Sequence, residues 1–590
     1  MRRSLPRYVL LLCFVLSSGV LQAQTVDPAE TRKLHAFFDA QWERGLRESP
    51  ERASLNGDRR FNDRWSDLDL DAIAARHQAT RDALAELGTI RREALSSEDR
   101  LNYDVMQWQL ERSIQRHRFG QHLLPVSHRG GPQTMGQIAA SLQFNSARDY
   151  RDWLARMRAV PQRLEQVTAL MREGMASGHV PPRVLMQRVP PQIAMQIVED
   201  AQSSQFYLPF RRFPDTIPAI ERTALQAEAK QVIVDAIVPA YRRFAAFFDE
   251  QYLPVTRDSI AATDLPDGKA WYDFLAETFT TTDLTAEQIH QIGLREVARI
   301  RGEMEKIREE VGFQGDLAAF FEHLRTDPKF FYKTPEALME AYLAISKRID
   351  PETVKIARTI PRMPYGVRPI PDNIAPDTTT AYYQGPALDG SRAGFYYVNL
   401  YRPEVRPTWE MMALSLHEAV PGHHFQIARA QELGELPKFR RSGGFTAYIE
   451  GWGLYAERLG YDMGLYEDPY DRMGQHAYDM WRAVRLVVDT GMHAKGWSRQ
   501  QAIDYFLENA PKTEADITNE IDRYIGNPGQ ALAYKIGQLK ISELRERAEQ
   551  ALGADFDIRD FNDAVLETGA VPLQVLEAHI DGWIAARQDR

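Results

Sequence analysis

The segment LSLHEAVPGHHFQ, residues 414–426, joins a histidine–glutamate pair to a proline and a second pair of histidines. In the common zinc-binding form H-E-x-x-H, two histidines share one face of a helix and the glutamate lies beside them. Here the position four residues after His417 is Pro421, which neither binds a metal nor continues a regular helix. The segment therefore indicates an interrupted metal-binding helix, with His423 or His424 as the second ligand.

The helix that carries His417 is expected to start at Thr408, a residue type that caps helices, and to distort at Pro421. The proline ring clashes with the carbonyl of His417, four residues earlier, so a kink or bulge is expected. In a regular helix, His424 would lie about 20° from His417 but about 10 Å along the axis. A two-residue bulge at Pro421 would instead bring His423 into the ligand position.

Three motifs carry a family resemblance. The end of the first motif, PGHH at 421–424, resembles the GH that closes the zinc motif of helical gluzincin peptidases, such as the thimet oligopeptidase, angiotensin-converting enzyme and M32-type carboxypeptidase families. Together with YIEGWGLYAE at 448–457 and PGQALAYKIGQLK at 528–540, HEAVPGHHFQ at 417–426 closely resembles a bacterial family known only as a domain of unknown function, DUF885. The resemblance covers nearly all of the mature chain. It implies a large helical gluzincin-like fold with a deep cleft, and it implies no substrate.

A gluzincin site takes a third ligand, usually a glutamate from a neighbouring helix. The resemblance assigns this role to Glu450, which lies 33 residues after the first histidine and is followed by Gly451 and Gly453, small enough for two helices to approach closely. Two imidazoles and one carboxylate suit Zn²⁺ and leave a fourth position for water. Glu457, two turns further, is either a hydrogen-bond partner of a ligand imidazole or a surface carboxylate paired with Arg458.

The same motif supplies a candidate catalytic base. Glu418 would take a proton from the attacking water and pass it to the leaving amine. A developing oxyanion also needs a donor, and helical gluzincins often use a tyrosine or histidine from the C-terminal half. Tyr534 is the first candidate and Tyr524 the second, although a tyrosine in a helix is more often a core residue. His424 is expected to support the site by a hydrogen bond or to exchange roles with His423.

The N-terminal residues 1–23 have the composition of a secretory signal peptide. Arg2, Arg3 and Arg7 precede a short apolar run, and small and polar residues follow up to Ala23. Cys13 lies within the apolar run, which argues against a lipoprotein signal, and a retained N-terminal anchor is the alternative. Because Cys13 is the only cysteine, the mature chain would have neither disulfides nor a thiolate catalyst. A periplasmic or secreted protein is expected.

The composition is that of a soluble globular protein. The 590 residues are 44% hydrophobic and 26% charged, and the net charge is −10. This negative charge disfavours nucleic acid or anionic lipid as the main partner. Amphipathic helical patterns dominate, including helices that start at Ser96 and Thr285 with capping-box spacing. We therefore expect a mainly α fold and one large domain over residues 24–590.

A small β element is expected next to the motif helix. Residues 377–400 contain two β-branched and aromatic runs around the turn-rich PALDGSRAG, which predicts a hairpin or a pair of edge strands. The proline-rich segment 360–376 before it is expected to be an ordered surface loop.

These features predict a secreted zinc-dependent hydrolase, and the resemblance to helical peptidases implies cleavage of short peptides, as an exopeptidase or an oligopeptidase. Two alternatives stay open: hydrolysis of a non-peptide amide or ester, and a non-catalytic protein that binds peptides or metal. Glu418 argues against the second alternative, because binding needs ligands but no base. Arg485, Arg523 and Lys535 are candidate partners for a peptide carboxylate.

Overall fold

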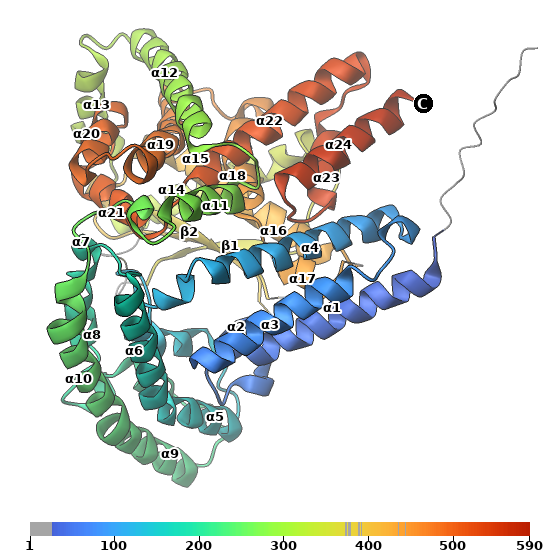
Figure 1. Ribbon diagram of the computed structural model, residues 1–590. Coiled ribbons are helices and arrows are strands. Elements are labelled where there is room, and N and C mark those ends of the chain that lie inside the picture. The colour runs from blue at the N-terminus through green and yellow to red at the C-terminus, as the bar shows by residue number, and fades with distance from the viewer. Residues whose placement is uncertain are drawn as a thin grey trace, which may run out of the picture.

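Helices carry most of this chain, and a small sheet lies near the middle of the molecule (Figure 1). The computed structural model describes residues 26–371, 375, 379–387, 390, 392–434, 436–442 and 444–589. The predicted signal peptide at 1–23 lies outside the described residues. None of the described helices has both the length and the apolar composition that crossing a membrane would require.

The N-terminal half forms a lobe of long helices, coloured blue to green in Figure 1. Its main helices are α1 (Pro28–Glu48), α3 (Leu70–Leu87), α4 (Ser97–Arg118), α5 (Ala147–Arg158), α6 (Val160–Ser177), α9 (Ala219–Val232) and α10 (Val238–Phe247), with the short α2 (Pro50–Leu55) between α1 and α3. The capping prediction at Ser96 is confirmed, because its hydroxyl accepts a hydrogen bond from the backbone N–H of Asp99 at 3.0 Å.

The C-terminal half forms the opposite side of the molecule in Figure 1. Its main helices are α11 (Gly268–Thr280), α12 (Ala286–Glu310), α14 (Pro335–Ile349), α15 (Met411–Glu418), α16 (His423–Glu432), α17 (Lys438–Ser442), α18 (Thr446–Met463), α19 (Pro469–Ala494), α21 (Glu514–Gly526), α22 (Leu532–Leu552), α23 (Ile558–Glu567) and α24 (Leu573–Gln588). The predicted capping box at Thr285 and Gln288 begins α12.

Buried side chains join the two halves. One large apolar cluster contains Trp153 from α5 together with Val484 from α19. A second contains Phe37 from α1 together with Leu544 from α22. The N-terminal helices therefore share their cores with the C-terminal helices, and burial of these apolar surfaces stabilises both together.

The sheet has three strands in the order β1-β3-β2. Strands β2 (Ala381–Gln384) and β3 (Gly394–Val398) pair antiparallel, which confirms the predicted hairpin, and both pack against α16. Strand β1 (Tyr365–Pro369) pairs parallel with β3 within the segment expected to be a loop. That expectation was wrong because an edge strand tolerates prolines at its ends, where no ladder hydrogen bond is lost. The prediction of a mainly helical fold with a small β element beside the motif helix is confirmed.

Candidate metal centre

The motif helix is broken at its proline. Helix α15 ends at Glu418, a new helix α16 begins at His423, and the Val420–Pro421 peptide between them is cis. The predicted two-residue bulge within one helix is therefore wrong. Pro421 has no N–H with which to continue the hydrogen bonds of α15, and the chain turns before a second helix begins. A Cβ atom at Gly422 would lie 1.8 Å from the carbonyl oxygen of His417, so this close turn requires glycine.

The start of the motif helix also differs from expectation. Thr408 is the first residue of a short 3₁₀ turn, Thr408–Glu410, and its side chain does not cap the turn. The α-helix proper begins one turn later, at Met411. The 3₁₀ turn takes the place of a side-chain cap as the entry to α15, as is frequent at helix N-termini.

Three predicted ligand side chains converge across the break. The Nε2 atoms of His417 and His423 lie 3.7 Å and 3.5 Å from Oε2 of Glu450 on α18. One nitrogen or oxygen atom from each side chain lies within 4.8 Å of the others. The two imidazole rings are nearly perpendicular, at 83°, with centroids 4.7 Å apart. This arrangement can hold a metal ion between two nitrogens and one carboxylate oxygen.

Glycines set how closely α18 approaches its neighbours. A Cβ atom at Gly453 would lie 2.8 Å from Cε1 of His417, so only glycine leaves room for the ligand ring. A Cβ atom at Gly451 would lie 2.6 Å from the Cα atom of Gly537 on α22. The prediction that Gly451 and Gly453 permit close helix approach is confirmed by these two contacts.

Glu457 lies behind His417 and not on the protein surface. Its side chain is fully buried, and Oε1 accepts a hydrogen bond from Nδ1–H of His417 at 2.8 Å. This bond holds a proton on Nδ1, so Nε2, the atom that faces Glu450, is the nitrogen that can give up its proton and bind a metal. Arg482 lies 3.7 Å from the same carboxylate oxygen and offsets part of its charge.

Interactions between the histidines and glutamates of this group shift the pKa values of His417 and Glu450 in opposite directions. Burial lowers the pKa of His417, but its hydrogen bonds to Glu450 and Glu457 outweigh burial and raise this pKa to about 9. Burial raises the pKa of Glu450, but the nearby charge of His423 and the contact with His417 hold it well below its ordinary value. A divalent cation would replace this ion pairing by direct bonds to the same atoms.

Glu418 and His424 have different surroundings. Glu418, the last residue of α15, is half-buried, and its carboxylate has no hydrogen-bond or ion-pair partner within the described part of the chain. His424 is turned toward the sheet: Nε2–H donates to the carbonyl of Met363 at 3.0 Å, and Nδ1 accepts from the hydroxyl of Tyr383 at 2.7 Å. Burial lowers the pKa of His424 to about 4, so the ring is neutral. Both of its nitrogens are engaged away from the metal group, which contains His423 instead.

The two candidate tyrosines also differ. The buried Tyr524 hydroxyl accepts from Nε of Arg485 at 2.7 Å and donates to Glu520 at 2.6 Å, so its hydrogen bonds are already made. Tyr534, in the first turn of α22, is half-buried, and the Arg485 guanidinium lies 4.4 Å from its ring centre. Burial and then the charge of Glu450 raise the pKa of Tyr534. Its role as the oxyanion donor stays a prediction.

Trp452, which supports the interruption between α15 and α16, was not predicted from the sequence. Trp452, one residue after Gly451, is fully buried, and its Nε1–H donates to the carbonyl of Pro421 at 2.8 Å. A buried indole N–H needs an acceptor, and the interruption of the helix leaves the carbonyl of Pro421 available to accept this hydrogen bond. The sequence signal for this contact was the position of Trp452 between Gly451 and Gly453. The glycines let another backbone segment approach the helix closely, and the indole N–H can then donate to that backbone.

Together these features define a mainly helical protein with a buried two-histidine, one-glutamate group able to hold a metal ion. The family model described as "Bacterial protein of unknown function (DUF885)" matches residues 50–580, and the chain belongs to that family. No curated protein matches this chain.

Two solved structures share the fold over nearly the whole chain. "The crystal structure of the putative lipoprotein from Colwellia psychrerythraea" superposes with a TM-score of 0.89 at 27% identity and covers 94% of this chain and 99% of that chain. "The structure of a putative lipoprotein of unknown function from Shewanella oneidensis" superposes with a TM-score of 0.72 at 18% identity, covering 93% of this chain and 99% of that chain.

Proposed function

We propose that this protein is a zinc-dependent hydrolase that cleaves short peptides. The observation that carries the proposal is the convergence of His417, His423 and Glu450 beside Glu418, whose carboxylate is free of partners in the described chain. A protein that only stored or bound metal would need the three ligands but not the adjacent base.

The donor set fits zinc. Two imidazole nitrogens and one carboxylate oxygen are a common catalytic zinc set, with the fourth position left for water. The Glu457 carboxylate on His417 is the outer partner that such histidine ligands usually have. When bound, zinc would supply Lewis-acid activation of water and of the substrate carbonyl.

The side chains of the protein then have distinct tasks. Glu418 takes a proton from the attacking water and returns it to the leaving amine. Glu457 keeps the proton of His417 on Nδ1, so that Nε2 stays available as a ligand. The Tyr534 hydroxyl is the candidate donor to the oxygen that becomes negative as the carbonyl is attacked.

Peptides are the proposed substrates for two reasons. The motif around His417 resembles that of helical peptidases, and a cavity of about 800 Å³ lies beside α16 and α18. That volume is within the range of pockets that hold ligands of short-peptide size. We also propose export to the cell envelope, which is supported by the composition of residues 1–23 and by the lipoprotein descriptions of the two similar structures.

Cleavage and metal content test the proposal together. Purified wild-type protein is incubated with a synthetic peptide library and with simple esters, and products are identified by mass spectrometry. We expect peptide cleavage, about one zinc per chain, and loss of both in Glu450→Ala. Full zinc occupancy in Glu450→Ala would contradict the ligand assignment. Turnover of esters without any peptide cleavage would favour a non-peptide substrate.

A further inference from the structure

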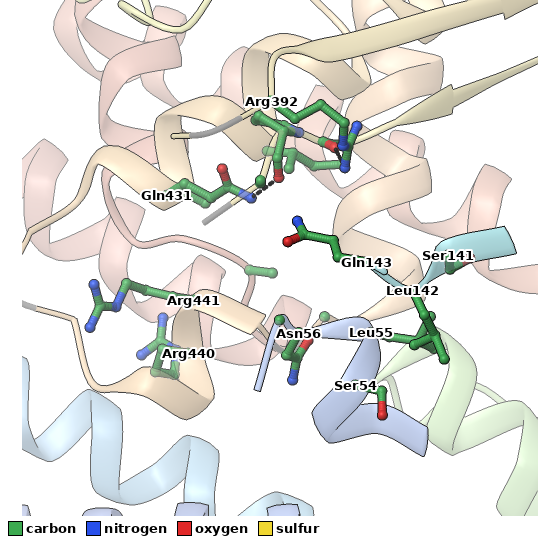
Figure 2. Close-up of a pocket in the computed structure, with 18 of the residues that line it drawn as sticks. Ser54, Leu55, Asn56, Ser141, Leu142, Gln143, Arg392, Gln431, Arg440 and Arg441 are labelled. Atoms are coloured by element: carbon green, nitrogen blue, oxygen red, sulfur yellow. Dashed lines mark hydrogen bonds between the residues drawn. The ribbon is translucent and has the colours of Figure 1, made fainter. Parts of the chain in front are cut away.

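A cavity of about 800 Å³ near the metal group is lined from both halves of the chain (Figure 2). The N-terminal half contributes residues 54–57, 59, 62 and 141–143, and the C-terminal half contributes residues of α16, α17 and the segment after β2. Figure 2 shows Arg392 near the top of the view and Arg440 with Arg441 at the lower left. Gln143 lies between them.

The described lining of the cavity includes none of the three residues of the metal group, but the cavity and the metal group share helices α16 and α18. Ile427, which lines it, is four residues after His423 on α16, so both side chains share one face about one turn apart. Ile449, which also lines it, directly precedes Glu450 on α18. A substrate of a few residues bound at the metal group would extend into this space.

The charged side chains that line the cavity in the described part of the chain are all arginines. Four arginines line the cavity, Arg59, Arg392, Arg440 and Arg441, and the described lining residues include no aspartate or glutamate. The whole chain has 82 acidic residues and a net charge of −10, so the described lining residues, whose only charges are positive, differ from the average of the molecule. A concave site of one sign raises the local concentration of ligands of the opposite sign.

Three of these arginines have no acidic partner among the described residues. Arg440 is 3% exposed and donates to neutral acceptors, Oδ1 of Asn102 at 2.7 Å and the carbonyl of Thr568, while its Nε–H has no partner. Arg392 donates to the backbone carbonyls of Gly385 and Ala393.

The other two arginines of the lining, Arg441 and Arg59, differ in whether they have an acidic partner. Arg441 has no ion-pair partner within the described residues, whereas Arg59 is paired with Asp149. The cations predicted as carboxylate partners each have an acidic partner: Arg485 and Arg523 share Glu520, and Lys535 pairs with Asp479. Arg392, Arg440 and Arg441 therefore bring positive charge without a described acidic partner to the lining of the cavity.

We propose that Arg392, Arg440 and Arg441 bind a carboxylate of the substrate, so that the preferred substrates are short peptides with an anionic group placed in this cavity. The guanidinium fork matches a carboxylate with two parallel hydrogen bonds. Gln143 from the N-terminal half and Gln431 from α16 also line the cavity and supply amide groups that can bind peptide backbone. The inference rests on the proposed peptidase function, and the carboxylate is either the free C-terminus or an aspartate or glutamate side chain.

Equilibrium binding tests this inference without requiring turnover. A fluorescently labelled alanine-based pentapeptide is made in three forms: free C-terminal carboxylate with an internal glutamine, C-terminal amide with an internal glutamate, and C-terminal amide with an internal glutamine. Affinity for the full-length Glu418→Gln protein is measured by fluorescence anisotropy. We expect at least tenfold tighter binding of one anionic form than of the neutral form, since charge-assisted hydrogen bonds are being compared with none. The form that binds identifies the source of the carboxylate.

Variants of the arginines test whether the preference for an anionic peptide depends on this cavity. In Arg392→Gln/Arg441→Gln, introduced into the same protein, the ratio of the two affinities should fall toward one. Arg362→Gln is the matched control, because Arg362 lies outside the cavity, is 86% exposed and pairs with Glu432 at the end of α16. Its affinity ratio should equal that of the parent. Arg440 is left unchanged because its buried hydrogen bonds contribute to folding.

The outcomes separate this inference from the proposed function. Equal affinities for the anionic and neutral peptides, or a preference that survives in the double variant, would overturn the carboxylate site even if peptides are cleaved. An anionic preference that the double variant loses would support the site even if the wild-type protein cleaves no peptide, in which case only the proposed hydrolysis fails.

Discussion

Oε1 of Glu457 accepts a hydrogen bond of 2.8 Å from Nδ1 of His417, and neither side chain is more than 4% exposed. The carboxylate fixes both the orientation of the ring and the nitrogen that carries the proton. His417 is thus oriented to bind a metal through Nε2, and binding would release the proton that this nitrogen holds in the metal-free protein.

Glu457→Gln should weaken metal binding without destroying the ligand set. The amide keeps the size of the side chain and one acceptor oxygen, but it lacks the charge that makes the imidazole a better donor to metal. We expect a loss of roughly 10-fold to 100-fold in zinc affinity, the scale found for such outer partners. Competition with a chromophoric chelator measures this affinity. An unchanged zinc affinity would show that Glu457 only fills space.

Glu418→Gln should separate catalysis from metal binding. The variant keeps the shape and hydrogen-bonding reach of the side chain but cannot accept the proton from water. Hydrolysis should fall by roughly two to four orders of magnitude, the scale of a lost general base. Zinc content and the thermal unfolding midpoint should stay near those of the wild type, because Glu418 is not a ligand and has no partner within the described residues. Undiminished turnover would exclude the proposed mechanism.

His423→Ala and His424→Ala should have opposite effects on metal content. His423 faces Glu450, whereas His424 is held by Tyr383 and the carbonyl of Met363. Zinc per chain, measured by elemental analysis, should therefore drop strongly in His423→Ala and persist in His424→Ala. His424→Ala should instead lower stability by about 1–3 kcal/mol, because it removes the hydrogen bonds of a buried imidazole to Tyr383 and to the carbonyl of Met363. An empty site in His424→Ala alone would reverse the assignment.

Asp489 should make stability depend on pH. Burial raises the pKa of its carboxyl to about 7, although Tyr272 and the N–H of Gly529 donate to it. An unfolded aspartate has a pKa of about 3.9, so between these values the folded state holds a proton that the unfolded state lacks. This contribution to the free energy of unfolding is present at low pH and is lost as pH rises through about 7.

The Asn variant isolates this contribution. Asp489→Asn keeps the size of the side chain and has no titratable proton, so its thermal midpoint should decline less than that of the wild type between pH 5 and pH 8. Parallel pH profiles for the two proteins would show that Asp489 does not titrate in this range.

The ligand residues were predictable because the motifs contain them within short segments. His417, His423 and Glu450 lie within 34 positions, and residue chemistry with a family resemblance was enough to select them. The break between α15 and α16 was not predictable in the same way. Local rules allow either a bulge or a break at Pro421, and the contact with Trp452 on another helix accompanies the break. The cavity was also out of reach, because Arg59, Arg392 and Arg440 meet only in the folded chain.

The contact between Gly451 and Gly537 has a consequence for how this group tolerates sequence change. Since α18 and α22 meet backbone to backbone there, contacts between main-chain atoms directly beside Glu450 help to fix its position, together with the buried side chains of the two helices. Repacking elsewhere between these helices can then proceed by accumulated substitutions while the carboxylate stays in place. The two glycines act as a fixed reference point, and a methyl group added to either one displaces the ligand more than many larger changes further along the same helices.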